Sequence, residues 1–120
     1  MILFYMELAS KKKIRIAWSN DSIELWFILH YQYLQTTPLR NQYFQILEKI
    51  WNLEESYESL GKKKAFCTSL YKGLLPKQKT AIYNATKLYE LHSNTYPISR
   101  RNPCTTVFIL VKELNKYLKK

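Results

Sequence analysis

The stretch DSIELWFILHYQYLQ, residues 21–35, decides the fold that the sequence predicts. Asp21 can cap a helix, with Glu24 three residues later at the spacing of a capping box. One face of this helix carries Ile23, Trp26, Phe27, His30 and Leu34. Much of the remaining surface is also apolar, through Leu25, Ile28, Leu29 and Tyr33. Since a helix that is apolar nearly all round is buried on more than one side, we expect it at the centre of the core.

Helix signals continue along the rest of the chain. Thr37 and Pro38 suit the start of a second helix, which would run to Leu60 over roughly 35 Å and end at Gly61. Its exposed face would carry a group of acidic residues, either solvated or in contact with a basic protein: Glu48, Glu54, Glu55 and Glu58. A short helix over residues 65–71, ended by Gly73, precedes another that opens at Leu75 and Pro76.

A turn is expected from Pro97 to Pro103, and Thr105 or Thr106 would cap a last helix. The predicted inner stripe of that helix is Val107, Leu110, Val111, Leu114, Tyr117 and Leu118. Residues 1–18 fit an extended N-terminal arm. The fold class is therefore all-α, with four or five helices in a single domain over residues 1–120.

Charge divides the chain into two unequal halves. Residues 1–60 are near neutral at −1, and residues 61–120 carry +11, which together give the net charge of +10. A surplus confined to one half points to a polyanionic partner. Nucleic acid is the commonest such partner, and an anionic membrane surface is the alternative.

The basic half offers a set of candidate phosphate contacts. One run follows the predicted long helix: Lys62, Lys63 and Lys64. Others fall on the outer side of the next helices, among tyrosines that could stack on unpaired bases: Lys72, Lys77, Lys79 and Lys87. The turn in KLYELHSNTYPISRRNPC, residues 87–104, adds Asn94, Arg100, Arg101 and Asn102. Adjacent guanidinium groups can grip phosphate oxygens, although the same residues would also suit an ordinary solvated loop.

Signals for catalysis are missing from the sequence. Gly61 and Gly73 are its two glycines, so it has no glycine-rich phosphate loop. His30 lies in the apolar band and is expected to be a hydrogen-bonded core residue rather than a ligand. Cys67 and Cys104 have neither zinc-knuckle nor redox-pair spacing, and we expect reduced, partly buried thiols. We predict no enzyme activity, catalytic residue, metal, cofactor or small-molecule substrate.

Two short motifs resemble mitochondrial small-subunit ribosomal protein number fourteen. They are Lys-Leu-Tyr-Glu-Leu at residues 87–91 with Asn94, followed by Arg101-Asn102-Pro103-Cys104 at the same separation as in that family. A Lys-Ala-Phe-Cys run at residues 64–67 also occurs in organellar members before a Leu-Pro pair. The resemblance covers about residues 62–104. Pro103 stands where the family has arginine, and the family's Thr-Gly-Arg segment and arginine-rich tail are missing.

This resemblance implies a structural constituent of the mitochondrial small ribosomal subunit, which binds rRNA in the head near the decoding region. Its partners would be small-subunit rRNA and neighbouring head proteins, with Arg101 and Asn102 as rRNA contacts and Asn94 at a turn. The implied location is the mitochondrial matrix. Glu7 and the order of the N-terminal segments do not suit an imported or secreted precursor, so we expect coding within the organelle.

Two other interpretations stay open from sequence. The apolar N-terminus with its basic flank, Lys11 to Lys13, would suit an accessory subunit of another organellar membrane assembly, such as a respiratory complex, with lysines facing lipid headgroups. No apolar run approaches the roughly 20 residues of a membrane span. A helical DNA-binding regulator is also conceivable, although no convincing helix–turn–helix pattern is present.

Overall fold

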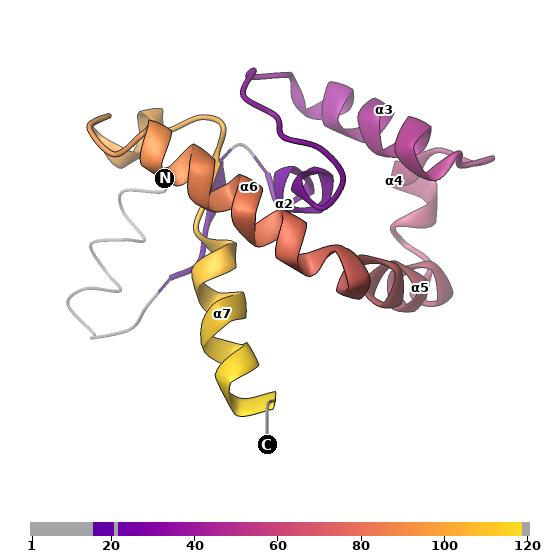
Figure 1. Cartoon of the computed structure of the whole chain (residues 1–120). Helices are drawn as coiled ribbons and strands as arrows, with labels where there is room; N and C mark the ends of the chain where they lie inside the picture. The colour runs from indigo at the N-terminus through magenta and orange to yellow at the C-terminus, as the bar shows by residue number, and fades with distance from the viewer. Residues whose placement is uncertain (1–15, 21, 119–120) are drawn as a thin grey trace.

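Helix α2 (Glu24–Leu29) lies at the centre of the protein, as the composition of residues 21–35 predicts (Figure 1). The computed structural model describes residues 16–20 and 22–118. Leu25, Ile28 and Leu29 of α2 are fully buried, and α2 packs on both α3 (Arg40–Trp51) and α6 (Gln78–Leu91). Burial of a leucine or isoleucine side chain contributes about 1.5–3 kcal/mol, so α2 anchors the core. The predicted cap Asp21 lies outside the described residues.

The all-α fold class is confirmed. Among the described residues, five helices have six residues or more, and a sheet of two short strands accompanies them. The remaining elements are α4 (Tyr57–Leu60), α5 (Lys64–Leu74), α7 (Val107–Leu118), the 3₁₀ helices η1 (Leu75–Lys77) and η2 (Ile98–Arg100), and strands β1 (Ser19–Asn20) and β2 (Cys104–Thr105). Most of the predicted N-terminal arm lies outside the described residues.

The predicted helix over residues 21–35 is shorter than expected. It ends at Leu29, whose carbonyl oxygen accepts a hydrogen bond of 2.8 Å from the Asn84 amide of α6. The following aromatic residues then contact different elements. The Tyr31 hydroxyl accepts from the Trp51 indole at 2.7 Å, while Tyr33 meets Lys87. Tertiary contacts therefore replace the last turns of the expected helix.

The predicted long helix to Leu60 is wrong, because the chain breaks at Asn52. Helix α3 ends with Asn52 in the left-handed conformation (φ 50°, ψ 53°). The Leu53 amide donates to the Glu48 carbonyl at 3.0 Å, and the Asn52 amide donates to the Lys49 carbonyl at 3.3 Å. These two bonds form a Schellman motif, in which asparagine takes the place of the usual glycine.

Helix α4 then starts afresh in a new direction. The Ser56 hydroxyl accepts from the Ser59 amide at 3.2 Å as its N-cap, and the Glu48 carboxylate accepts from the Tyr57 amide at 2.8 Å. One acidic residue of the expected solvated face, Glu48, is thus a structural contact. Tyr57 is buried beside the rings of Phe44, Trp51 and Phe66.

Strand β1 pairs with β2, the strand that directly precedes α7. Ser19 pairs with Thr105 and Asn20 with Cys104 in an antiparallel register. The Thr106 amide donates to the Trp18 carbonyl at 2.8 Å, and the Thr105 hydroxyl caps α7 by accepting from the Val107 amide at 3.2 Å. The predicted threonine cap of this helix is confirmed.

Helix α7 extends away from the rest of the protein (Figure 1). Phe108 is buried and contacts Tyr89 at 5.8 Å between ring centroids, and Asn115 donates to Gln78 at 2.8 Å. The predicted inner stripe is wrong for three positions, which are largely exposed: Leu110, Leu114 and Tyr117. They lie outside the core because α7 meets α6 through the side that carries Phe108, Val111 and Asn115.

Candidate functional site

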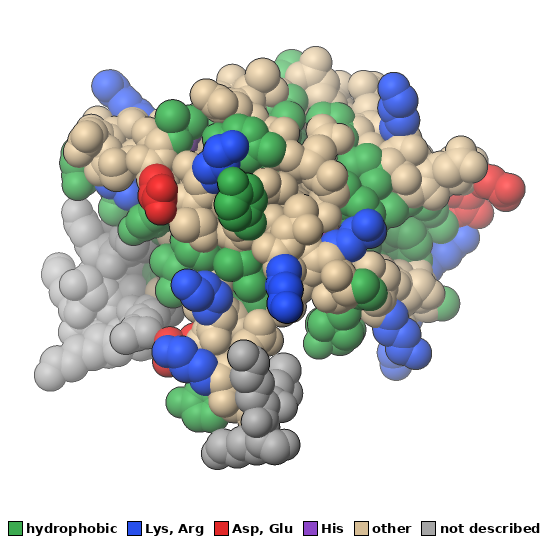
Figure 2. Space-filling model, in the orientation of Figure 1, with side chains coloured by type: hydrophobic (Ala, Val, Ile, Leu, Met, Phe, Trp, Pro, Cys, Tyr) green, Lys and Arg blue, Asp and Glu red, His purple; other side chains and the backbone are tan. Residues whose placement is uncertain are grey.

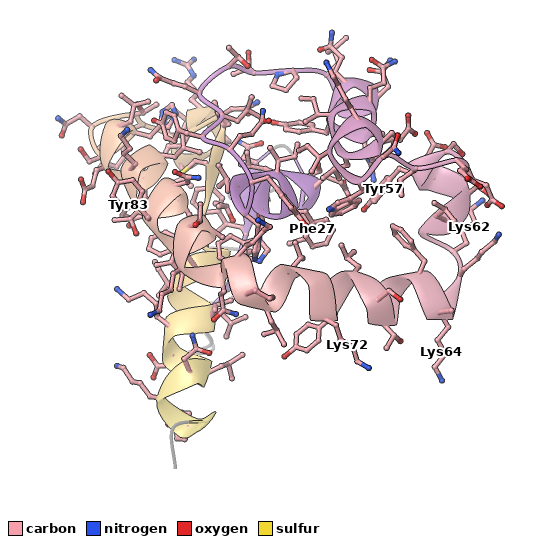
Figure 3. The ribbon with its side chains drawn as sticks, turned by 45° about the vertical axis from the view of Figure 1, so that its right-hand side comes forward. Phe27, Tyr57, Lys62, Lys64, Lys72 and Tyr83 are labelled. Carbon is pink, nitrogen blue, oxygen red and sulfur yellow. The ribbon has the colours of Figure 1, made fainter. Side chains whose placement is uncertain are left out.

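All seven predicted lysine contacts are exposed, and they lie within the α5–η1–α6 segment or directly before it. Helices α5 and α6 follow one another through η1, and basic side chains are spread over this face (Figure 2). Lys64 and Lys72 point away from Tyr57 and Phe27, which lie on the other side of α5 (Figure 3). We use the name lysine ridge for the exposed lysines of α5 and α6: Lys64, Lys72, Lys79 and Lys87.

The sequence of α6 explains why its lysines face solvent. Its buried residues, Ala81, Asn84, Ala85 and Leu88, recur every three or four positions and pack toward α2. Because a helix has 3.6 residues per turn, positions 79, 83 and 87 fall on the opposite side. Lys79 and Lys87 therefore stand on one exposed stripe, with Tyr83 between them.

Aromatic rings hold two of the predicted lysines. The Lys87 ammonium lies 4.6 Å from the centroid of the Tyr33 ring and 6.0 Å from that of Tyr83. The Lys77 ammonium lies 5.3 Å from the Tyr31 ring centroid. A cation over an aromatic face is attracted by the ring but keeps its charge, so these contacts orient the lysines without neutralising them.

The lysine run at residues 62–64 has acidic residues close to it in sequence. Lys63 forms an ion pair of 2.9 Å with the exposed carboxylate of Glu55. Glu54 and Glu58 are exposed nearby in sequence. Both partners of the ion pair are about half exposed, so solvent screens the interaction strongly. Acidic residues therefore closely precede Lys62 and Lys63 in sequence, whereas α5 contains no acidic residue.

The adjacent arginines do not form a pair that could grip one phosphate. Arg101 is only 7% exposed, and its guanidinium donates to the carbonyl oxygens of Thr95 at 2.9 Å and Ser93 at 3.3 Å. It also lies 5.0 Å from the Tyr96 ring centroid. Arg100, in contrast, is exposed. Arg101 thus holds the loop after α6 together, and sequence offers no sign of which arginine turns inward.

The two asparagines of this loop, Asn94 and Asn102, are not part of the lysine ridge. Asn94 is exposed in the turn after α6. Asn102 is half-buried, and its side-chain oxygen has no hydrogen-bond partner among the described residues. Cys104, two positions after Asn102, is fully buried, and burial raises the pKa of its thiol to about 11, against the opposing charge of Arg101. This thiol is protonated at neutral pH and is a poor nucleophile.

The predicted core role of His30 is confirmed. Its ring nitrogen Nδ1 lies 2.9 Å from the Trp26 carbonyl oxygen, and its ring meets the Trp26 ring edge-on at 4.9 Å. Burial lowers the pKa of His30, although hydrogen bonds to the backbone of Trp26 and Phe27 act in the other direction. Within the described ranges, no group of three His, Cys, Asp or Glu residues could hold a metal ion.

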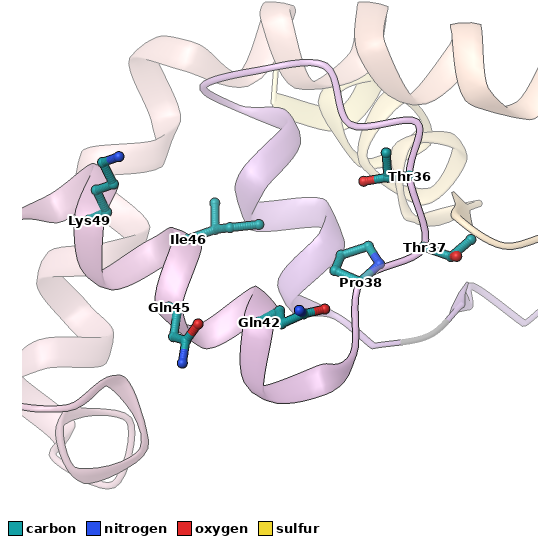
Figure 4. Close-up of a pocket in the computed structure, with 7 residues that line it drawn as sticks. All are labelled: Thr36, Thr37, Pro38, Gln42, Gln45, Ile46 and Lys49. Atoms are coloured by element: carbon teal, nitrogen blue, oxygen red, sulfur yellow. The ribbon is translucent and has the colours of Figure 1, made fainter.

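A surface hollow of about 630 Å³ lies beside the start of α3 (Figure 4). Its lining side chains come from the segment before α3 and from one face of that helix: Thr36, Thr37, Pro38, Gln42, Gln45, Ile46 and Lys49. None of the predicted site residues lines it. In residues 16–20 and 22–118, no helix is long and apolar enough to cross a membrane.

The sequence predicts tyrosines among the lysines of the basic half, and the structure shows which of these tyrosines are exposed. Tyr83 is 66% exposed, and Tyr71 on α5 is 62% exposed. A usable signal was present for Tyr83, which stands four residues from both Lys79 and Lys87. Residues four apart on a helix are neighbours on its surface.

The fold and its surface define a small, basic, all-α protein with exposed lysines along two consecutive helices. Comparison with protein families identifies this protein more specifically than the fold does. The family model for RloB-like protein matches residues 4–114. The chain therefore belongs to the RloB-like protein family. No curated protein and no solved structure gives a significant match.

This membership corrects the family and function predicted from short motifs. The chain is not a member of the ribosomal protein family that its motifs resemble, so the role in the mitochondrial ribosome is wrong. Nothing supports the alternative role in an organellar membrane assembly either. The motif residue Arg101 has a local structural role, which accounts for its place in the loop without rRNA. The mitochondrial location stays an untested prediction.

Proposed function

We propose that this RloB-like protein binds the phosphate backbone of nucleic acid through the lysine ridge. The observation that carries the proposal is the exposure of lysines along α5 and α6, while the apolar side of α6 packs into the core. Residues 61–120 contribute a net charge of +11 to this part of the chain. Such a concentration of charge favours binding to a polyanion over binding to a small neutral ligand.

Lysines suit this role because their ammonium groups neutralise phosphates as point charges. Each phosphate contact releases condensed counterions, so affinity falls as salt concentration rises. Lys64, Lys72 and Lys79 are exposed, and Lys87 is oriented by Tyr33 without losing its charge. The proposed role is binding without catalysis, in line with the absence of catalytic motifs from the sequence.

The test is fluorescence anisotropy with labelled RNA and DNA oligonucleotides, single-stranded and duplex, over a range of salt concentrations. We expect the logarithm of the association constant to fall linearly with the logarithm of salt concentration. Substitution of Lys72→Gln or Lys79→Gln should reduce the magnitude of this slope by about one each. The matched control is Lys49→Gln, because Lys49 is exposed on α3 and outside the lysine ridge.

Two results would contradict the proposal. One is wild-type protein that binds none of these nucleic acids, or binds them with affinity indifferent to salt. The other is an equal loss of slope in Lys49→Gln and the ridge variants, which would place the contacts elsewhere or show that net charge alone acts.

A further inference from the structure

We propose that Tyr83 is a stacking platform for an unpaired base, so that the lysine ridge prefers single-stranded nucleic acid to duplex. This inference rests on the proposed function and names the class of ligand for the same surface. Tyr83 is 66% exposed on α6, and it occupies the side of that helix opposite the buried Ala81, Ala85 and Leu88. The core therefore does not account for its aromatic ring.

The position of Tyr83 between two lysines suits one strand of nucleic acid. Lys79 and Lys87 stand one turn before and one turn after it, so their Cα atoms are about 12 Å apart along the helix axis. The Lys87 ammonium lies 6.0 Å from the Tyr83 ring centroid and 4.6 Å from that of Tyr33. A ring flanked by two cations on one helix face lets a base stack while its neighbouring phosphates meet the ammonium groups.

Duplex nucleic acid cannot use this ring in the same way. Its bases are already paired and stacked, and their faces are not available to a side chain on an exposed helix. Single strands present a π-face on every base, so stacking on tyrosine tolerates any sequence. The lysines act on both forms of nucleic acid, whereas Tyr83 adds affinity only for the unpaired form.

The test compares wild type, Tyr83→Ala and Tyr83→Phe on oligo(rU), oligo(dT) and a duplex of about 12 nucleotides per strand, within the site sizes known for single-strand binders. We expect Tyr83→Ala to lose on the order of 5- to 100-fold in single-strand affinity. Its duplex affinity should stay within about twofold, because the phosphate contacts are unchanged. Tyr83→Phe keeps the ring and should bind like wild type. The two oligonucleotides show whether RNA or DNA is preferred.

Tyr117→Ala is the matched control, because Tyr117 is 67% exposed on α7 and lies outside the lysine ridge. Circular dichroism should show equal helix content in every variant. The inference is overturned if Tyr83→Ala lowers single-strand and duplex affinity equally, or if it changes neither. Wild-type protein that binds neither form would instead overturn the proposed function, so the two failures are distinguishable.

Discussion

The hydroxyl of Tyr57 donates a hydrogen bond of 2.9 Å to the carboxylate of Glu24 inside the protein. Both residues are only 8% exposed, and the second carboxylate oxygen of Glu24 has no hydrogen-bond partner among the described residues. The bond joins α2 to α4 across 33 positions of sequence. Since an acidic group with few partners is costly to bury, Tyr57 is the contact that makes Glu24 tolerable at this position.

Removal of the Tyr57 hydroxyl should therefore destabilise the protein more than the loss of a surface hydroxyl. We expect Tyr57→Phe to lower the free energy of unfolding by about 1–3 kcal/mol, because Glu24 loses its partner while the ring contacts are kept. Urea unfolding measures the change. Tyr71→Phe, at a position 62% exposed, is the control and should change stability by less than about 0.5 kcal/mol. Equal effects would contradict this account of Glu24.

The adjacent arginines should differ strongly in their effect on stability. Arg101→Ala removes a buried guanidinium that donates to the Thr95 and Ser93 carbonyl oxygens, and we expect a loss of about 1.5–3 kcal/mol. Arg101→Lys should not restore stability, because lysine lacks the planar set of donors. Arg100→Ala is the control and should be nearly neutral. Thermal unfolding of the three variants tests the prediction, and a larger loss for Arg100→Ala would overturn it.

Asn52 should tolerate glycine but not a β-branched residue. Its left-handed conformation is costly for most L-residues by roughly 1–2 kcal/mol, and asparagine and glycine are the usual exceptions. We expect Asn52→Gly to leave stability unchanged or slightly higher and Asn52→Val to lower it by about 1 kcal/mol. Chemical denaturation checks both. Equal stability of the valine and glycine variants would contradict the assigned C-cap.

The buried His30 should make the protein less stable in acid. Burial lowers its pKa in the folded state from 6.5, so below that value the unfolded chain binds more protons than the folded one. The stability that neutral His30 contributes is present above pH 6.5 and is lost as pH falls through the folded-state pKa. We expect the free energy of unfolding of wild type to fall more steeply over this window than that of His30→Gln. Parallel pH profiles would contradict the prediction.

The lysines of the candidate site were predictable, whereas the role of the arginines was not. Apolar residues of α6 recur with helical spacing, which by itself turns Lys79 and Lys87 outward. The neighbouring Arg100 and Arg101 have identical chemistry and similar local sequence. Only the folded loop, which brings the Thr95 and Ser93 carbonyl oxygens to the Arg101 guanidinium, distinguishes them.

The short motifs also did not identify the family to which the chain belongs. The resemblance to a ribosomal protein depended on a few residues between positions 62 and 104, whereas the RloB-like match extends over residues 4–114. Short runs rich in lysine and asparagine recur in unrelated basic proteins because composition alone produces them. A match along most of the chain depends on many positions and therefore identifies the family.

The helical fold class, the burial of α2 and the threonine cap of α7 were predictable from the sequence, because periodicity and capping are local properties. Where each helix ends, and which of its sides faces the core, depends instead on tertiary contacts. The end of α2 depends on Asn84 from α6, and the burial of α7 depends on which side meets α6. These outcomes rest on contacts between residues far apart in sequence, which no local pattern encodes.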